Sequence, residues 1–211
     1  LLKEVLIGRQ PILDLHQELM GYELLFRSAN VPAETPGCGL TATASVVCTV
    51  FSELGIGDSL GAHKAFINAD EAFILDDVVE LLPAGSVVLE LNFDTVPNDA
   101  VLARCRQLRD RGYTLALARY TGLDPRASAL LPLVGIVKID VQTAGDSLAD
   151  LVCALLRLPL KVLAEKVETR EQMEHCRALG FHLFQGYYFA RPTIISGRHL
   201  SASQLGIIRL V

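Results

Sequence analysis

The sequence predicts an α/β protein built as a TIM-like (β/α) barrel, and three features of the chain support this fold. The chain has 211 residues, 51% of them hydrophobic and 20% charged, as in a globular domain with a sizeable core. Short apolar runs alternate with stretches of helical periodicity, the pattern of a parallel sheet covered by helices. About seven strands follow the first turn, a number that favours a closed barrel over an open doubly wound sheet, the alternative fold.

The first 54 residues are predicted to form a β-hairpin and one helix. Two extended segments, 5–13 and 19–26, flank a polar turn at 14–18. A loop rich in Pro, Gly and Thr leads to residues 41–54, whose apolar residues recur at helical spacing before Gly55.

Strands and helices then alternate along the rest of the chain. No GxGxxG or GxxxxGK[ST] loop follows any of the strands, which argues against a nucleotide-binding open sheet. The predicted strands are 65–68, 87–90, 114–117, 135–140, 161–164 and 182–184, and the predicted helices are 71–82, 98–111, 125–131, 147–156 and 170–179.

Charge, cysteine content and hydropathy exclude several functional classes. A net charge of -5 and a pI near 5.5 provide no electrostatic attraction for nucleic acid or an anionic membrane. No apolar run approaches the roughly 18 residues needed to span a bilayer. The cysteines form no CxxC pair, so free thiols in a reducing compartment are expected rather than disulfides or a zinc site, and the protein is predicted to be cytoplasmic. They are Cys38, Cys48, Cys105, Cys153 and Cys176.

Polar residues stand at the ends of the predicted strands. In a parallel barrel these ends form the open mouth, where reactive side chains gather. A single carboxylate there is more often a helix cap, but several carboxylates in one register repel each other unless a cation lies among them. The set therefore predicts a site derived from a divalent-metal centre that acts on a phosphodiester. Its members are Glu23, Asn68, Glu90, Asp140 and Glu165, with Lys138 two residues before Asp140.

Seven segments resemble the motifs of EAL domains, the cyclic di-GMP phosphodiesterases. The most specific are Ala-Glu-Lys-Val-Glu-Thr at 164–169 and Phe-Gln-Gly-Tyr-Tyr-Phe-Ala-Arg-Pro at 184–192. The signature segment Tyr-Glu-Leu-Leu-Phe-Arg at 22–27 has Leu where the motif has Ala. The other matching segments are 9–12, 66–68, 89–91 and 137–140.

The resemblance implies a role for each matching position. Metal ligation, with Mg²⁺ or Mn²⁺, is implied for Glu23, Asn68, Glu90 and Asp140. Catalysis is implied for Lys138 and Glu165, support of the site for Glu168, and dinucleotide binding for Gln10, Arg27, Asn68 and Gln185. The resemblance also implies that 1–193 form the EAL-like barrel and that 194–211 lead toward a C-terminal HDOD domain.

One strand departs from the family pattern. Where EAL domains read Ala-Leu-Asp-Asp-Phe-Gly, this chain reads Ala-Leu-Ala-Arg-Tyr-Thr at 116–121, so both metal-binding aspartates are replaced, by Ala118 and Arg119. A guanidinium about 4 Å from a divalent ion, at an effective dielectric near 20, would cost on the order of 8 kcal/mol. The sequence therefore predicts a pseudo-phosphodiesterase without bound metal, in which the catalytic residues are vestigial.

Arg119 has two interpretations. In the first, its guanidinium pairs with Glu90, Asp140 or Glu23 and neutralises carboxylates that have no metal. In the second, it clamps a phosphate of cyclic di-GMP without a metal.

Three functional hypotheses follow. The first is a regulatory module that binds a signalling protein, with a homodimer and a C-terminal domain of the same chain as further partners. The second is a cyclic di-GMP receptor without hydrolysis, and the third is a weak metal-dependent phosphodiesterase. Ala118 and Arg119 argue against the third hypothesis, and the sequence does not decide between the first two, of which the interaction module is taken as the leading prediction.

Overall fold

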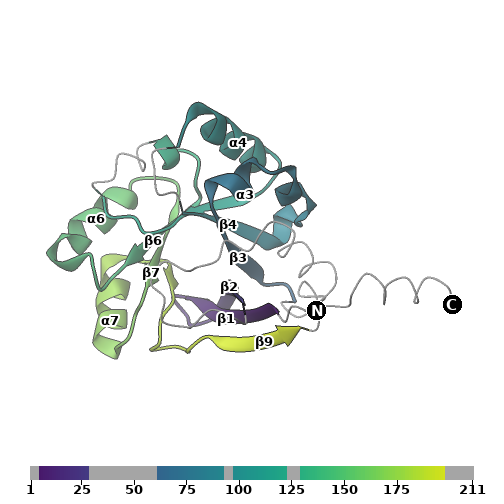
Figure 1. Cartoon of the computed structure of the whole chain (residues 1–211). Helices are drawn as coiled ribbons and strands as arrows, with labels where there is room; N and C mark the ends of the chain where they lie inside the picture. Colours follow the sequence, from purple (N-terminus) through teal and green to yellow (C-terminus); the bar gives the residue numbers. More distant parts are fainter. Residues whose placement is uncertain (1–4, 29–60, 93–96, 123–128, 198–211) are drawn as a thin grey trace.

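A computed structural model describes residues 5–28, 61–92, 97–122 and 129–197 and confirms the predicted barrel (Figure 1). One sheet runs in the order β2-β3-β4-β5-β6-β7-β8-β1-β9, and β1 also pairs with β2, which closes the ring. The helices lie outside the strands (Figure 1). No helix in these ranges is long and apolar enough to cross a membrane.

The opening hairpin supplies the strand that closes the barrel. Strand β1 (Val5–Asp14) is antiparallel to β2 (Leu19–Ser28), to β8 and to β9 (Thr193–Gly197). The parallel arrangement holds from β2 to β8. Residues 194–197, assigned from the sequence to the connection 194–211, thus extend the sheet through β9, and the predicted helix at 41–54 lies outside the described residues.

The remaining strands and most of the helices follow the sequence predictions within one or two residues. Most of the predicted helix 125–131 lies outside the described residues. The strands are β3 (Lys64–Ala69), β4 (Val87–Leu91), β5 (Thr114–Leu117), β6 (Ile136–Asp140), β7 (Lys161–Glu165) and β8 (Leu183–Phe184). The helices are α4 (Asp99–Asp110), α6 (Leu148–Leu155) and α7 (Arg170–Leu179), with short 3-10 turns η2 (Ala84–Ser86) and η3 (Gly145–Ser147).

The predicted helix 71–82 is wrong as a single element, because it is broken at Asp76. Helix α3 (Glu71–Leu75) ends there, and the 3-10 helix η1 (Asp77–Leu81) begins. Asp76 has extended backbone, and its carboxylate accepts a hydrogen bond from the Val78 amide at 2.9 Å. The carboxylate thus caps a new helix start in the middle of an apolar periodicity.

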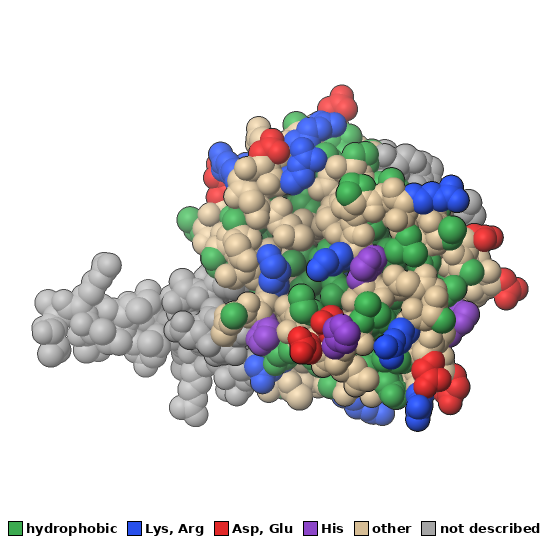
Figure 2. Space-filling view, turned by 180° about the vertical axis from the view of Figure 1, so that it is seen from behind, with side chains coloured by type: hydrophobic (Ala, Val, Ile, Leu, Met, Phe, Trp, Pro, Cys, Tyr) green, Lys and Arg blue, Asp and Glu red, His purple; other side chains and the backbone are tan. Residues whose placement is uncertain are grey.

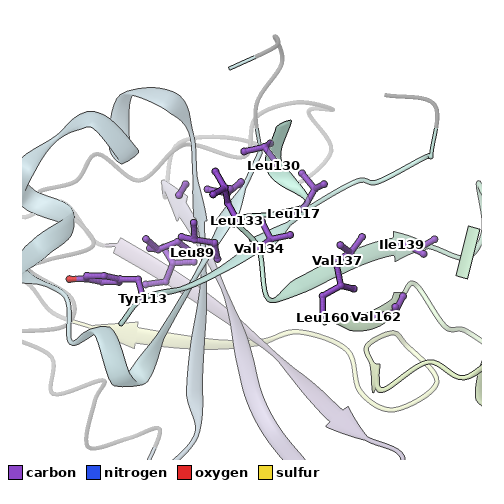
Figure 3. Close-up of a cluster of buried hydrophobic side chains, with 14 of the residues drawn as sticks. Leu89, Tyr113, Leu117, Leu130, Leu133, Val134, Val137, Ile139, Leu160 and Val162 are labelled. Atoms are coloured by element: carbon purple, nitrogen blue, oxygen red, sulfur yellow. The ribbon is translucent and has the colours of Figure 1, made fainter. Parts of the chain in front are cut away.

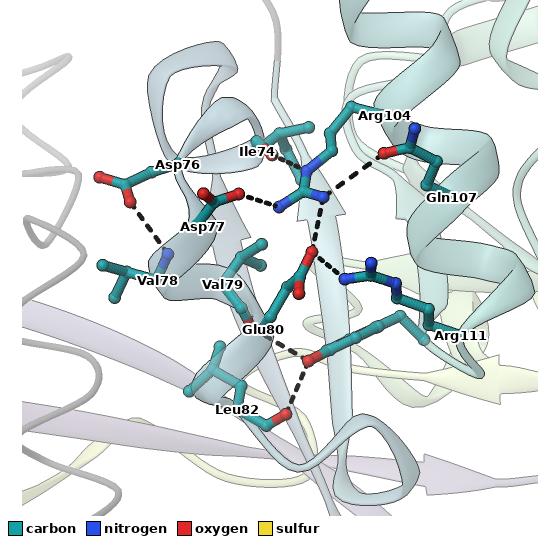
Figure 4. Close-up of polar contacts among 11 residues, drawn as sticks. Ile74, Asp76, Asp77, Val78, Val79, Glu80, Leu82, Arg104, Gln107 and Arg111 are labelled. Atoms are coloured by element: carbon teal, nitrogen blue, oxygen red, sulfur yellow. Dashed lines mark hydrogen bonds and ion pairs between the residues drawn. The ribbon is translucent and has the colours of Figure 1, made fainter.

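Contacts from α4 hold the broken segment in place (Figure 4). The Arg104 guanidinium donates to the Ile74 carbonyl at 3.2 Å and to Glu80 at 2.6 Å, and its third nitrogen lies 3.3 Å from Asp77. It therefore binds the end of α3 and the start of η1 together. The Tyr113 hydroxyl lies within hydrogen-bond distance of two carbonyl oxygens near the end of η1, at 3.0 Å from that of Val79 and 2.7 Å from that of Leu82.

Two apolar regions form the core. The larger lies between the strands and the helices and includes Leu89, Leu117, Val137 and Val162 (Figure 3). The smaller is a layer inside the barrel, to which seven strands contribute one buried side chain each. Its members are Ile12, Phe66, Val88, Ala116, Ile136, Leu163 and Leu183.

Candidate functional site

A polar layer lies next to the apolar layer inside the barrel. Because side chains alternate between the two faces of a strand, the residue two positions further along each strand faces the same interior. On the parallel strands this residue lies two positions later in the chain, and on the antiparallel β1 it lies two positions earlier. The seven positions are Gln10, Asn68, Glu90, Ala118, Lys138, Glu165 and Gln185.

Six of the seven positions carry a polar side chain, and the seventh is Ala118. Its amide donates to the Leu91 carbonyl at 3.2 Å, which continues the ladder between β4 and β5 beyond the end of β5. The chain thus places Ala118 in register with Glu90 and Lys138 but supplies no oxygen ligand there. Glu23, expected at a strand end, lies in the middle of β2 and completes the layer.

Lys138 binds three carboxylates at the centre of this layer. Its side chain is 1% exposed, and its Nζ lies 2.6 Å from Glu90, 3.0 Å from Glu165 and 3.1 Å from Glu23. Two of its three N–H donors form hydrogen bonds with Glu90 and Glu23, and Glu165 is bound as an ion pair. The positive charge that the carboxylates require is therefore supplied by the protein.

The charges of this cluster are strongly coupled. Burial disfavours the charged form of Lys138, but Glu165, Glu23 and Glu90 outweigh it and raise its pKa well above the ordinary value. One ammonium cannot neutralise three buried carboxylates, so one carboxyl is expected to keep a proton. Burial and then the charge of Glu23 raise the pKa of Glu90 to about 8, the direction that favours the proton on Glu90.

Glu23 stays ionised because of its neighbours. Burial alone would raise its pKa, but the charge of Lys138 and hydrogen bonds from Gln185 and Asn68 leave the pKa lowered. The amide of Gln185 donates to Glu23 at 2.6 Å and to the side-chain oxygen of Gln10 at 3.0 Å, and Asn68 donates to Glu23 at 3.4 Å. Gln10 in turn donates to the Ala190 carbonyl at 3.2 Å.

Gln185 also provides a buried acceptor. Its Oε1 is buried and has no hydrogen-bond partner among the described residues. Buried acceptors of this kind are uncommon in native structures and call for an explanation.

Asp140, the fourth predicted metal ligand, pairs with a lysine other than Lys138. Its Oδ2 lies 2.5 Å from the Nζ of Lys166, and its Oδ1 accepts a hydrogen bond from the Gln142 amide at 2.9 Å. This hydrogen bond with Asp140 is the main cause that raises the pKa of Lys166. The predicted carboxylate ligands are thus divided between two lysines. Lys166 was missed because a lysine directly after a strand gives no sequence signal for this role.

The predicted pairing of Arg119 with Glu90, Asp140 or Glu23 is wrong. Lys138 and Lys166 make the ion pairs of these carboxylates. Arg119 is exposed and donates to the side chain of Asn92. Its backbone is left-handed, with φ 53°, which a pattern of residue types does not reveal.

The two remaining predicted residues lie apart from the polar layer or are described only in part. Glu168 is exposed, and its amide donates at 2.8 Å to Gln172 at the start of α7. Arg27 lies in β2 opposite Leu6, and its side chain is outside the described residues.

The residues present do not fit a centre of two divalent ions. Mg²⁺ and Mn²⁺ require several oxygen ligands directed at one point. Here Ala118 supplies none, and one oxygen of each of Glu23, Glu90 and Asp140 is paired with an ammonium group. Within the described ranges, no group of three or more His, Cys, Asp or Glu side chains has an arrangement that could hold a metal ion.

Comparisons with known proteins agree with this fold. The chain is 32% identical over 202 residues to the protein YuxH of Bacillus subtilis, and 32% identical over 211 residues to the cyclic di-GMP phosphodiesterase CdgJ of Vibrio cholerae. These matches cover 93% and 97% of this chain but 49% and 48% of the relatives, so the chain spans about half the length of the curated relatives it matches.

Solved structures show the same fold at lower identity. A standalone EAL protein from Vibrio cholerae, in its cyclic di-GMP bound form, is 22% identical with a TM-score of 0.70, and the match covers 90% of this chain and 92% of that one. An EAL domain protein from Listeria monocytogenes is 22% identical with a TM-score of 0.68, covering 89% and 88%.

The model of the family described as the EAL domain matches residues 63–192, which include six of the seven positions of the polar layer. This chain belongs to the EAL domain family.

Proposed function

We propose that this EAL domain does not hydrolyse cyclic di-GMP and acts as a regulatory protein-interaction module. The observation that carries the proposal is the binding of Glu23, Glu90 and Glu165 by the single buried Lys138. One oxygen of each of these carboxylates lies within 3.1 Å of the Lys138 ammonium group, where a metal ion would need it. The related Vibrio cholerae protein CdgJ is named a cyclic di-GMP phosphodiesterase, which supplies the reaction to be tested.

The chemistry of the polar layer supports this proposal. Hydrolysis of a phosphodiester needs an activated water and positive charge on the leaving oxygen. Lys138 donates to Glu90 and Glu23 and is also ion-paired with Glu165, so its ammonium group is held by carboxylates rather than directed at a water or a phosphate. Ala118 offers no oxygen on the neighbouring strand, at a position in register with Glu90 and Lys138.

An apolar and basic surface at the amino ends of the strands supports the interaction role. Two pockets of about 530 and 600 Å³ share the wall at 158–160. Exposed Met20, Leu156 and Leu158 line the first. Lys64, Lys161 and Arg109 lie among the lining residues, and none of those described is Asp or Glu. Near the middle of one face of the molecule, Lys or Arg, His and some Asp or Glu side chains lie around hydrophobic ones (Figure 2). An acidic partner with apolar side chains matches this surface.

A repair experiment tests the absence of hydrolysis. Purified chain is incubated with cyclic di-GMP and Mn²⁺, and linear dinucleotide is measured by chromatography. We expect none from the unaltered chain and a measurable rate from the double variant Ala118→Asp with Arg119→Asp, which restores both acidic positions. Arg109→Asp, at the opposite end of the barrel, is the control for added negative charge. Steady hydrolysis by the unaltered chain that is lost in Glu23→Ala would overturn the proposal.

Binding of cyclic di-GMP without hydrolysis is the second candidate. The buried Oε1 of Gln185 favours it, because an unpaired buried acceptor can receive a hydrogen bond from a ligand. Calorimetric titration of cyclic di-GMP in EDTA tests this function. Saturable binding that Gln185→Leu weakens at least tenfold would favour the receptor function. No heat of binding from folded protein would exclude the receptor function and leave the interaction module as the proposed function.

The cytoplasmic location, homodimerisation and an HDOD domain after residues 194–211 remain predictions, and residues 198–211 lie outside the described part of the chain.

A further inference from the structure

Two basic residues near the carboxyl ends of the strands have left-handed backbone. Among the described non-glycine residues, positive φ values occur at Gln17 in the hairpin turn, at Arg119 (53°) and at Lys166 (58°). Left-handed backbone is sterically disfavoured for residues that have a Cβ atom, so Arg119 and Lys166 adopt it at an energetic cost. Strained backbone of this kind gathers at functional sites.

The left-handed turn at Lys166 places its side chain on Asp140. Lys166 directly follows Glu165, which ends β7, and Glu165 pairs in register with Asp140, which ends β6. The Lys166 Nζ lies 2.5 Å from Asp140 Oδ2. Gln142 links the same two residues a second time, because its amide donates to Asp140 Oδ1 at 2.9 Å and its side chain donates to the Lys166 carbonyl at 3.1 Å.

The two lysines divide the surviving carboxylates between them. Lys138 binds Glu23, Glu90 and Glu165, and Lys166 binds Asp140. We infer that Lys166 is a built-in counter-ion that occupies the cation position beside Asp140 and keeps divalent metal ions from it. This inference rests on the proposed function and assigns to Lys166 the exclusion of metal ions at Asp140, beside the effects of Ala118 and Lys138 on the rest of the site.

Coulomb's law gives the size of the expected effect. A divalent ion on Asp140 would lie about 4 Å from the Lys166 ammonium, and with the dielectric of water the repulsion corresponds to about thirty-fold in affinity. The water value is the appropriate one because the Lys166 side chain is 64% exposed. Rotation of the side chain away from Asp140 would reduce the effect, so we expect Mn²⁺ to bind ten- to thirty-fold tighter when Lys166 is removed.

The experiment measures Mn²⁺ binding directly, without substrate. Free Mn²⁺ is followed by electron paramagnetic resonance during titration of the full chain and of Lys166→Gly. Glycine accepts left-handed backbone, so this variant is expected to fold with an unchanged or higher Tm. Lys166→Asn is the second variant, because Asn also tolerates left-handed backbone but keeps a side chain. Both variants should bind Mn²⁺ at least tenfold more tightly than the unaltered chain.

Lys161→Ala is the matched control, because it removes the same charge from the amino end of the same strand. Its Mn²⁺ affinity should equal that of the unaltered chain. A change below threefold in both Lys166 variants, or an equal gain in Lys161→Ala, would overturn the inference. Hydrolysis by the unaltered chain would instead contradict the proposed function, so the two failures are distinguishable.

Discussion

Glu90 is the residue whose charge state the barrel interior controls most strongly. It is 1% exposed and lies 2.6 Å from Lys138, yet burial and the charge of Glu23 raise its pKa to about 8. The folded chain therefore holds this proton over a pH range in which the unfolded chain has lost it. By linkage, the stabilising contribution of the proton is fully present below pH 4.5 and is lost as the pH rises through about 8. The lowered pKa of Glu23 acts in a separate window, below pH 4.5.

Glu90→Gln should remove this pH dependence, because the amide has nearly the shape of the protonated carboxyl and does not titrate. Urea unfolding in metal-free buffer at pH 5, 6, 7 and 8 measures the effect. The free energy of unfolding of the unaltered chain should fall across this range, and the variant should give a flatter curve. Glu18→Gln, in the exposed hairpin turn, is the control and should leave the slope unchanged. Parallel curves for Glu90→Gln and the unaltered chain would show that another group controls the slope.

Residue types alone led to the wrong cation for neutralising the carboxylates of the site. Lys138, Glu90 and Glu165 could be predicted from strand alternation and from motifs, and the structure brings them together. The sequence assigned neutralisation to Arg119, whose side chain instead contacts Asn92. Arg119 and Lys166 both have positive φ, a backbone conformation about which the sequence contains little information for residues other than glycine.

Helix α7 shows at the element scale why its limits could be predicted to the residue. Thr169 and Gln172 form a reciprocal capping box, and Gly180 ends the helix with φ 95°. Both signals are local and are visible as residue types at fixed spacing. The break at Asp76 was not predicted, because a periodic apolar pattern masked a capping side chain and because the stabilising contacts come from Arg104 in another helix.

Loss of the capping box should destabilise the domain by about 1 kcal/mol. Thr169→Ala removes the acceptor of the Gln172 amide, which lies 3.2 Å from the Thr169 hydroxyl oxygen. Gln172→Ala removes the acceptor of the Glu168 and Thr169 amides. Because the two halves of a box depend on the same turn, the double variant should cost less than the sum of the single variants. Chemical denaturation of the four proteins measures the coupling, and strict additivity would contradict a reciprocal box.

The closed barrel depends, at the scale of the whole molecule, on two loops that meet at the mouth. The loop after β7 and the loop after β8 are joined where the Val167 amide donates to the Gln185 carbonyl at 3.1 Å and the Tyr188 amide donates to the Val167 carbonyl at 3.0 Å. Gly186 lies between these contacts. A Cβ atom at this position would lie 2.0 Å from the Val167 oxygen and 2.3 Å from its nitrogen. Only glycine allows the two backbones to approach this closely.

Gly186→Ala should therefore affect the whole barrel rather than one turn. The two loops must separate, which moves Gln185 away from Glu23 and Gln10 and disturbs the polar layer that connects β1, β2 and β8. We expect a loss of about 3 kcal/mol in the free energy of unfolding, at the upper end for an overpacked site. Gly85→Ala is the control, because no heavy atom lies within 4 Å of the added Cβ, and it should change stability by less than about 1 kcal/mol. Equal stability of the two variants in urea would show that the loop contact does not hold the barrel closed.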